Sequence, residues 1–229
     1  MPGKMMAPLN GVPLIEHVVH RVSRASLVDK VCVCTTDQPG DDPLAAHVES
    51  LGVDVYRGSV DDVLGRFYWA SQRYPDADAI VRITGDDAFK DPALIDYAIE
   101  AFLTLWAEKP TEKPVHYVHL GGATWPLGMD VEVFTPQALH WAHADATRPY
   151  DREHVTSWFT EAVIRRDDRF GIAVLKDKQG RGSIDMRWTI DTPEDYSFAA
   201  IVYDKLGDNF GYDDMIAADV EGLRRYPVA

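Results

Sequence analysis

The chain is short of cysteine, of cations relative to acids, and of long apolar runs, and each shortage excludes a class of protein. Its 229 residues carry 23 Lys and Arg against 37 Asp and Glu, which gives a net charge of −14. Binding to a nucleic-acid backbone or an anionic membrane needs a concentrated basic face, so this balance argues against both partners. No apolar stretch approaches the ~20 residues of a membrane-spanning helix, and no signal-peptide pattern opens the chain.

The two cysteines, Cys32 and Cys34, stand two residues apart in a β-type run. This spacing places them side by side on one face of a strand, where they are poorly arranged for a mutual disulfide. Free thiols are typical of a reducing compartment, so we expect a soluble, cytoplasmic protein. With 46% hydrophobic residues the chain can bury a substantial core, and we expect one domain over residues 1–229.

Helix and strand patterns alternate along the first half of the chain. Helical spacing of apolar residues at 13–25, 44–51, 59–74 and 91–102 alternates with β-type runs at 30–36, 53–56 and 79–84. This order predicts an α/β fold with a mostly parallel sheet and helices on both faces. The second half is more mixed, with strands expected at 116–120, 129–134, 170–175 and 186–190 and helices expected from Thr135, over 151–165 and from Thr192. A Gly-rich stretch predicts an excursion from the sheet at about 116–134.

Two predicted strands end in acidic segments, RITGDD and RWTIDTPED, which contain Asp86 and Asp191. Ligands of open parallel sheets gather at the carboxyl ends of the strands. Taken singly, each aspartate is as readily a loop residue or a helix cap. As a pair at strand ends, the two carboxylates would suit one Mg²⁺, a hard cation that completes its shell with water and substrate phosphates.

Two further polar runs, GSVDDVLGR and PYDREHV, each have two interpretations. The first is a capped helix start or a ligand site, and the second is a solvated helix start or a cluster for a carboxylate or hydroxyl-rich substrate. The histidine pairs HVVH, HYVH and HWAH lack the further ligands that a zinc site needs. The sequence contains no nucleophile elbow, Walker loop or dinucleotide fingerprint.

The segment Pro2-Gly3-Lys4 raises the question of what precedes it. A Pro-Gly pair marks a turn between elements. A lysine beside flexible backbone is suited to holding phosphate. We therefore expect a strand before this turn, and the chain as given has none.

Six segments occur in an order that resembles a known family: PGKMMAPLNGVPLIEHV, RGSVDDVLGRFY, RITGDD, GMDVEVF, REHVTSWF and RWTIDTPEDY. They resemble the cytidylyltransferases related to CMP-Kdo and CMP-sialate synthetases, and most closely the spore-coat polysaccharide synthesis protein F group. The likeness runs from Pro2 to about Tyr203. It implies a nucleotide-diphospho-sugar transferase fold, a Rossmann-like α/β/α sandwich, and transfer of CMP from CTP to a sugar hydroxyl with release of pyrophosphate.

The resemblance also implies roles for single residues. Asp86 and Asp191 match the family's magnesium ligands, and Lys4 matches the lysine of its phosphate-binding L-P-G-K segment. The implied nucleotide neighbours are Asp62 and Arg82, and the residues implied to face the sugar acceptor are Asp130, Arg152, Glu153 and His154. The family usually has a small residue and then proline after the metal aspartate, whereas this chain has Asp87-Ala88.

The family's opening strand and basic, hydroxyl-bearing turn come before its L-P-G-K segment. We therefore expect the sheet to lack its first strand, with the start of the chain placed inside the motif. The region at about 116–134 resembles the one through which related synthetases dimerise, so we expect a homodimer.

Three functions are compatible with these patterns. The first is a Mg²⁺-dependent cytidylyltransferase in surface or spore-coat polysaccharide synthesis, with CTP and an acidic or modified sugar as substrates. The second is a glycosyltransferase that uses a preformed sugar nucleotide on the same fold. The third is a catalytically impaired binding or assembly module that lacks the triphosphate loop.

Overall fold

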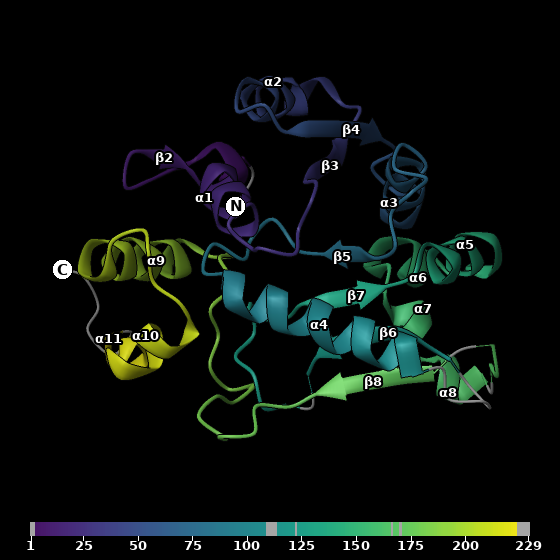
Figure 1. Cartoon of the computed structure of the whole chain (residues 1–229). Coiled ribbons are helices and arrows are strands. Elements are labelled where there is room, and N and C mark those ends of the chain that lie inside the picture. Colours follow the sequence, from purple (N-terminus) through teal and green to yellow (C-terminus); the bar gives the residue numbers. More distant parts are fainter. Residues whose placement is uncertain (1–2, 109–113, 122, 166, 170, 224–229) are drawn as a thin grey trace.

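The computed structural model describes residues 3–108, 114–121, 123–165, 167–169 and 171–223 (Figure 1). The strands are β1 (Pro8–Leu9), β2 (Val12–Pro13), β3 (Cys32–Thr36), β4 (Asp54–Gly58), β5 (Ile80–Arg82), β6 (Val115–Leu120), β7 (Glu132–Phe134) and β8 (Gly171–Leu175). The α-helices are α1 (Leu14–Val22), α2 (Asp42–Ser50), α3 (Val63–Ser71), α4 (Pro92–Glu108), α5 (Pro136–Asp145), α6 (Pro149–His154), α7 (Ser157–Thr160), α8 (Ala162–Arg165), α9 (Pro193–Leu206), α10 (Tyr212–Ala217) and α11 (Val220–Leu223). Two single 3₁₀ turns, η1 (Lys4–Met6) and η2 (Pro39–Asp41), complete the described elements.

The strands form one mixed sheet and two smaller pairs. The larger sheet has the order β5-β7-β6-β8, in which β6 and β8 are parallel and β7 runs antiparallel to both of its neighbours. β3 and β4 form a separate parallel pair, and β1 and β2 form a short hairpin. The predicted α/β fold is thus confirmed, with an antiparallel strand inside the larger sheet.

The two faces of the larger sheet are covered by different helices. Alternate residues of a strand point to opposite faces, so Val118 and Val133 belong to the core under α4, whereas Tyr117 and Phe134 belong to a second core beneath α5 and α7. In Figure 1, α4 crosses one face of this sheet and α5 to α8 gather at one end of it.

Helix α1 links the β3–β4 pair to the rest of the molecule. On one side its Val18 and Val22 pack into the core that includes α4 and α9, and on the other its Ile15 and Val19 pack against α2. Each fully buried aliphatic side chain of this kind contributes ~1.5–3 kcal/mol. Figure 1 accordingly shows α1 between the β3–β4 pair and helices α4 and α9.

Of the helix caps expected from the sequence, three are present, whereas Asp42 lies inside α2, which has no side-chain cap, and Ser59 is replaced by Asp62. Asp91, Thr135 and Thr192 accept backbone N–H groups at the starts of α4, α5 and α9. At α3 the cap is Asp62, whose carboxylate accepts from Gly65 N at 2.8 Å. Ser59, the expected first member of a capping box, instead accepts from Asp61 N, because the helix begins only at residue 63.

Two predicted elements are wrong as drawn from the sequence. The segment 186–190 is extended but not a strand, since Trp188 N donates to Leu127 O and Ile190 N donates to Asp86 O instead of joining a regular ladder. The single helix expected over 151–165 is three short helices. Val155, with φ of 53°, makes a tight turn in which Thr156 N donates to His154 O, and this turn ends α6.

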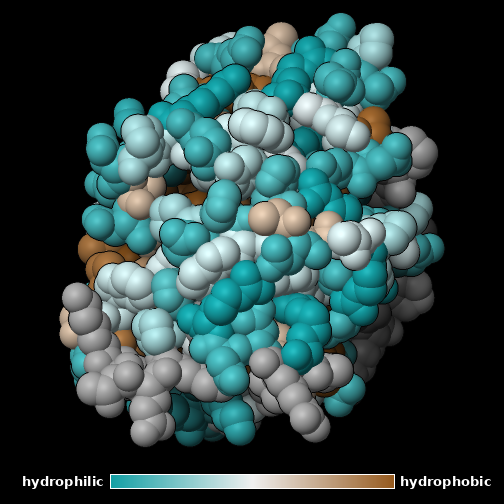
Figure 2. Space-filling view, turned by 90° about the vertical axis from the view of Figure 1, so that its right-hand side faces the viewer, coloured by the Kyte–Doolittle hydropathy of each residue, from teal (hydrophilic) through white to brown (hydrophobic). Residues whose placement is uncertain are grey.

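Polar residues cover much of one side of the molecule. The face formed by the α5 to α8 end of the molecule is mainly hydrophilic (Figure 2). Among the described residues, no helix has both the length and the apolar content needed to cross a membrane. Cys32 and Cys34 are free, half-buried thiols of β3.

Candidate active site

Three side chains from distant parts of the chain meet at one point. Lys4 Nζ lies 3.2 Å from Asp86 Oδ2 and 2.9 Å from Asp191 Oδ1. The same ammonium donates to Ile190 O at 2.8 Å. One cationic nitrogen therefore lies between the two carboxylates that the sequence identified at separate chain positions.

The position of Lys4 is determined by its neighbours in the short turn η1. Met5 and Met6 pack against the cores on either side of α1. A Cβ at Gly85 would lie 3.0 Å from Met5 Sδ, so glycine at this position allows η1 to approach the end of β5 closely. Lys4 is thereby held against the segment that carries Asp86.

Asp86 and Asp191 are brought together by backbone contacts. Asp86 follows β5 closely, and its carbonyl accepts from Ile190 N at 3.1 Å. Asp191 stands just before the Thr192 cap of α9, and Asp195 accepts the backbone N–H groups of both Asp191 and Thr192. Since Asp195 satisfies these backbone donors, the carboxylate of Asp191 is left to face Lys4.

The cluster contains further polar side chains that sequence reasoning missed. Arg187 Nη2 donates to Asp191 Oδ2 at 2.8 Å and to Asp195 Oδ2 at 3.1 Å, and Thr189 Oγ1 donates to Asp191 Oδ2 at 3.0 Å. A signal was available, because Arg187 precedes Asp191 by four residues in an extended segment and its long side chain can reach it.

The charges of the cluster stabilise one another. The hydrogen bond from Lys4, followed by those from Arg187 and Thr189, lowers the pKa of Asp191 to about 2 even though burial acts in the opposite direction. Burial alone would lower the pKa of Lys4, but its contacts with Asp191 and Asp86 outweigh this and raise it. Lys4 and Asp191 are therefore both charged at neutral pH.

A polar cavity of about 110 Å³ is lined by Arg82, Thr84, Asp130 and Glu132. Thr84 stands two residues before Asp86, so the cavity lies beside the same strand exit. Arg82 is directly opposite Glu132 in the β5–β7 ladder and pairs with its Oε2, and Tyr117 donates to Oε1 at 2.7 Å. Burial would raise the pKa of Glu132, but the Arg82 charge and these hydrogen bonds lower it, so Glu132 is ionised.

Glu132 is a second residue that sequence reasoning missed. It stands in the GMDVEVF segment two residues after Asp130, so both point to the same face of an extended chain. The pairing of Glu132 with Arg82 depends on the antiparallel register of β7, which the expectation of a mostly parallel sheet did not contain.

The other predicted site residues lie apart from Lys4. Arg152 of α6 pairs with Asp62 at 2.5 Å and also donates to His143 O at 3.0 Å, which ties α6 to the start of α3. Although burial opposes it, the hydrogen bond from Arg152 lowers the pKa of Asp62. Glu153 and His154 are exposed. In the part of the chain that the structure describes, none of these four side chains has a hydrogen bond to Lys4, Asp86 or Asp191.

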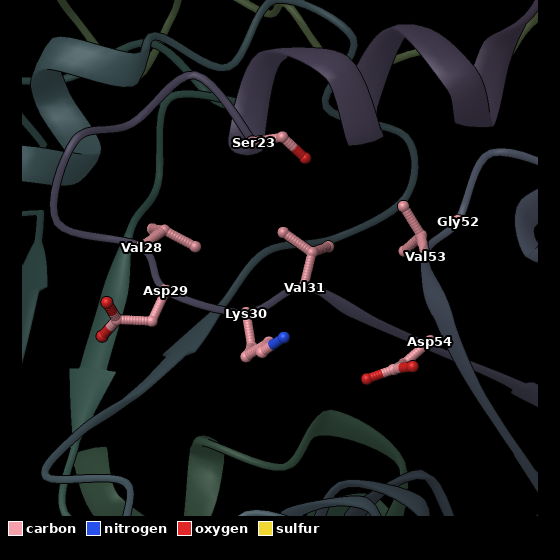
Figure 3. Close-up of a pocket in the computed structure, with 8 residues that line it drawn as sticks. All are labelled: Ser23, Val28, Asp29, Lys30, Val31, Gly52, Val53 and Asp54. Atoms are coloured by element: carbon pink, nitrogen blue, oxygen red, sulfur yellow. The ribbon is translucent and has the colours of Figure 1, made fainter.

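A larger cavity, of about 260 Å³, lies at the amino ends of β3 and β4 (Figure 3). It is bounded by Ser23 at the end of α1 and by residues 28–31 and 52–54, with the charged side chains of Asp29, Lys30 and Asp54 on one side. None of the predicted site residues lines it, and it lies at the ends of β3 and β4 opposite to Thr36 and Gly58, their carboxyl ends.

The donor set fits a hard divalent cation. Asp86 and Asp191 present carboxylate oxygens to a single cationic centre, which in this structure is the Lys4 ammonium. Among the described residues, no group of three or more His, Cys, Asp or Glu side chains could hold a metal ion. Mg²⁺ is commonly bound by only one or two carboxylates, with substrate phosphates and water as the other ligands, so two carboxylates suffice.

The cluster of two carboxylates and a lysine lies at a strand exit, which is where open α/β sheets bind their ligands. The cytidylyltransferase family model matches residues 1–211. The chain belongs to this family and is a nucleotidyltransferase.

The chain is also similar to individual proteins. The chain is 33% identical over 97% of its length to an uncharacterised protein of Methanocaldococcus jannaschii, 83% of which is covered. It is 30% identical over 91% of its length to the spore coat polysaccharide biosynthesis protein SpsF of Bacillus subtilis, 82% of which is covered. A 3-deoxy-manno-octulosonate cytidylyltransferase of Trichlorobacter lovleyi is 40% identical, over 44% of this chain and 39% of that protein.

Solved structures show the same fold. A cytidylyltransferase of Leptospira borgpetersenii superimposes with a TM-score of 0.86 at 26% identity and covers all of this chain and 93% of its own. A CMP:2-keto-3-deoxy-manno-octonic acid synthetase complexed with CTP superimposes with a TM-score of 0.59 at 13% identity over 90% of this chain and 93% of its own. This second likeness is one of fold alone.

Proposed function

We propose that the protein is a Mg²⁺-dependent cytidylyltransferase that transfers CMP from CTP to a sugar hydroxyl and releases pyrophosphate. The observation that carries the proposal is the position of Lys4 between Asp86 and Asp191. In this reaction the sugar oxygen attacks the α-phosphorus of CTP and gives up its proton to a base, a new P–O bond forms, and the bond to the pyrophosphate oxygen breaks. The protein has to place the reactants and neutralise charge, and no covalent enzyme intermediate is required.

Each member of the cluster has a defined part in the proposal. Asp86 and Asp191 hold Mg²⁺, which when bound neutralises charge on the phosphates. Before a divalent cation occupies the two carboxylates, Lys4 is protonated, because its contacts with them raise its pKa. Its ammonium is the group available to the leaving pyrophosphate once a divalent cation occupies the carboxylates. Arg187 and Thr189 orient Asp191 by binding its second oxygen.

The polar cavity beside β5 is our candidate for part of the sugar site. Arg82 offers N–H donors, and Asp130 and Glu132 offer carboxylate oxygens. Hydroxyl groups both donate and accept, so a mixed lining of this kind suits a polyhydroxylated acceptor. Asp130 keeps the acceptor role that the resemblance implied, and Arg82, implied to lie near the nucleotide, lines the same cavity. For Asp62, Arg152, Glu153 and His154, contact with nucleotide or acceptor stays a prediction.

The biological setting is part of the proposal. The printed name of the Bacillus subtilis relative refers to spore coat polysaccharide biosynthesis, and that relative matches 91% of this chain. We therefore propose a role in surface-polysaccharide synthesis. A cytoplasmic location and a homodimer formed through residues 116–134 stay predictions.

The test is pyrophosphate release from CTP in the presence of Mg²⁺ and a panel of acidic and neutral sugars, including 3-deoxy-manno-octulosonate. We expect release that depends on CTP, Mg²⁺ and one sugar class, with a loss of about 1000-fold or more in Asp86→Asn. Turnover of only a preformed CMP- or UDP-sugar would overturn the proposal in favour of a glycosyltransferase.

A parallel assay distinguishes the third alternative. The same measurement is made on this chain and on a version extended upstream in frame. CTP binding in calorimetry without release by either version would identify a binding module. Release that appears only in the extended version would show that the phosphate-binding segment needs the preceding residues.

A further inference from the structure

Lys90 is a buried cation that the proposed reaction does not use. It stands in the connection from β5 to α4, and it is 0% exposed. Its ammonium lies 2.9 Å from Asp87 Oδ2 and 2.9 Å from Gly128 O, and it also donates to Asp130 O. Burial of an ammonium is strongly unfavourable unless its protons are all bonded, and here each of the three has a partner.

Asp87 is the buried counter-ion of Lys90. It is 2% exposed, and its Oδ2 also accepts from Thr84 Oγ1 at 2.6 Å. Its Oδ1 is buried with no hydrogen-bond partner among the described residues. The carboxylate thus depends on Lys90 and Thr84 alone. Asp87 stands at the first of the two positions, Asp87-Ala88, where the chain departs from the pattern that the resemblance implied.

The pair joins two of three segments that surround the candidate active site. Lys90 ties the segment with Asp86 to the segment with Gly128 and Asp130. The second segment is tied to residues 186–190 by hydrogen bonds between Leu127 and both Met186 and Trp188. The hydrogen bond from Ile190 N to Asp86 O then connects the third segment back to the first. The three segments form a closed ring.

The segment with Gly128 and the segment 186–190 approach each other closely, so their relative position is restricted. Gly128 has a φ of +98°, and a Cβ on it would lie 2.9 Å from the carbonyl carbon of Trp188. Beyond the β5–β7 ladder, which pairs Arg82 with Glu132, the Lys90 side chain adds hydrogen bonds between the first and second segments. A change at Lys90 would therefore alter the placement of Asp86 and Asp130 together.

We propose that Lys90 is a positioning residue for the divalent-cation site. It fixes the segment carrying Asp86 relative to the segments carrying Asp130 and Asp191 through its bonds to Asp87, Gly128 and Asp130. This role rests on the proposed function only in taking Asp86 and Asp191 as the cation ligands. Replacement of outer residues that orient metal ligands typically reduces metal affinity 10–100-fold.

The test is a titration of the full-length protein with Mn²⁺ in place of Mg²⁺, with free Mn²⁺ followed by electron paramagnetic resonance. Lys90→Met removes the ammonium and keeps most of the side-chain volume. Lys30→Met is the matched control, because Lys30 is exposed at the amino end of β3. We expect the Mn²⁺ dissociation constant to rise about tenfold in Lys90→Met and to stay at the wild-type value in Lys30→Met.

A second variant keeps the test decisive if Lys90→Met fails to fold. The double variant Asp87→Asn/Lys90→Met removes both charges, so no unpaired charge is buried, but it also lacks the bonds from Lys90 to Gly128 and Asp130. With near-wild-type circular dichroism and thermal midpoint, it should still bind Mn²⁺ at least about fivefold more weakly. Wild-type Mn²⁺ affinity in a folded Lys90 variant would overturn the positioning role.

Asp86→Asn separates this inference from the proposed function. If Asp86→Asn binds Mn²⁺ as wild type does, the proposed cation site itself is wrong. If Asp86→Asn loses Mn²⁺ binding and the Lys90 variants keep it, the cation site stands and only the role of Lys90 is rejected.

Discussion

Two lysines flank the same aspartate-bearing segment, and they are held in opposite ways. Lys4 has a side chain that is 20% exposed and is bound by two carboxylates from separate segments. Lys90 is fully buried and is bound by one neighbouring carboxylate and two backbone carbonyls. The proposed function requires a divalent cation to take the place of the Lys4 ammonium, whereas the surroundings of Lys90 are closed to solvent. By this proposal a metal ion replaces the Lys4 ammonium between the carboxylates, whereas the Lys90 ammonium stays in place.

The largest expected effect comes from breaking the buried ion pair between Lys90 and Asp87. Lys90→Met leaves Asp87 buried without its counter-ion, and breaking a buried ion pair in this way typically costs ~3–5 kcal/mol of unfolding free energy. Urea unfolding followed by circular dichroism measures this loss. Asp87→Asn/Lys90→Met should recover most of it, because no unpaired charge remains buried. A loss below ~1 kcal/mol in the single variant would show that the pair is not needed for stability.

Removing the contacts of Lys4 with Asp86 and Asp191 should affect activity rather than stability. Lys4→Met is expected to lower kcat for pyrophosphate release by ~100- to 1000-fold, the usual result of removing one preorganised charge-stabilising donor. Mn²⁺ affinity without nucleotide should not fall, because the competing ammonium is gone from between Asp86 and Asp191. The assay is run beside the Mn²⁺ titration, with Lys30→Met as control. Weaker Mn²⁺ binding by Lys4→Met would contradict the exchange.

The same comparison can be made with a third ion pair, between Arg152 of α6 and Asp62 at the start of α3. Arg152→Met removes the bond to Asp62 between α6 and α3. As a partly exposed pair, it should contribute only ~1 kcal/mol to stability. If the pair serves stability alone, kcat/KM should change less than about twofold. Urea unfolding and the pyrophosphate assay test both values. A rise of about tenfold in the KM of the sugar would instead support the acceptor role that the sequence predicted.

The smallest expected effect is the pH dependence of the stability that Asp191 contributes. The folded-state pKa of Asp191 is about 2, below its ordinary value. Its stabilising contribution is therefore complete above pH ~4 and is lost as the pH falls toward 2. The difference in thermal midpoint between wild type and Asp191→Asn should be constant from pH 5 to 7 and shrink below pH ~4. A difference that grows on acidification would contradict this sign.

The fold and part of the site were accessible from the sequence because they depend on local signals. The caps at Asp91, Thr135 and Thr192 lie next to the helices they begin. The sequence identifies Asp86 and Asp191 because each follows an extended run and precedes a turn or helix start. To predict that these two aspartates lie close together, one needs only the rule that the carboxyl ends of parallel strands lie at one edge of the sheet.

The remaining features depend on contacts between distant segments. Lys4 lies 82 residues from Asp86 and 187 from Asp191, so no local pattern places it between them. The Arg82–Glu132 pair follows from an antiparallel strand within the larger sheet. Substrate contact by residues 152–154 stays a prediction, since these residues lie together in α6, where Arg152 pairs with Asp62 and Glu153 and His154 are exposed.

Ile190 gives the site one further property. Its N–H binds the Asp86 carbonyl and its own carbonyl binds the Lys4 ammonium. The main chain of a single residue therefore sets the separation between the lysine and the segment that carries the aspartate, while its side chain is fully buried in the core. A substitution at position 190 would therefore change the packing of the core but keep both backbone hydrogen bonds, because every residue except proline has the same N–H and C=O groups.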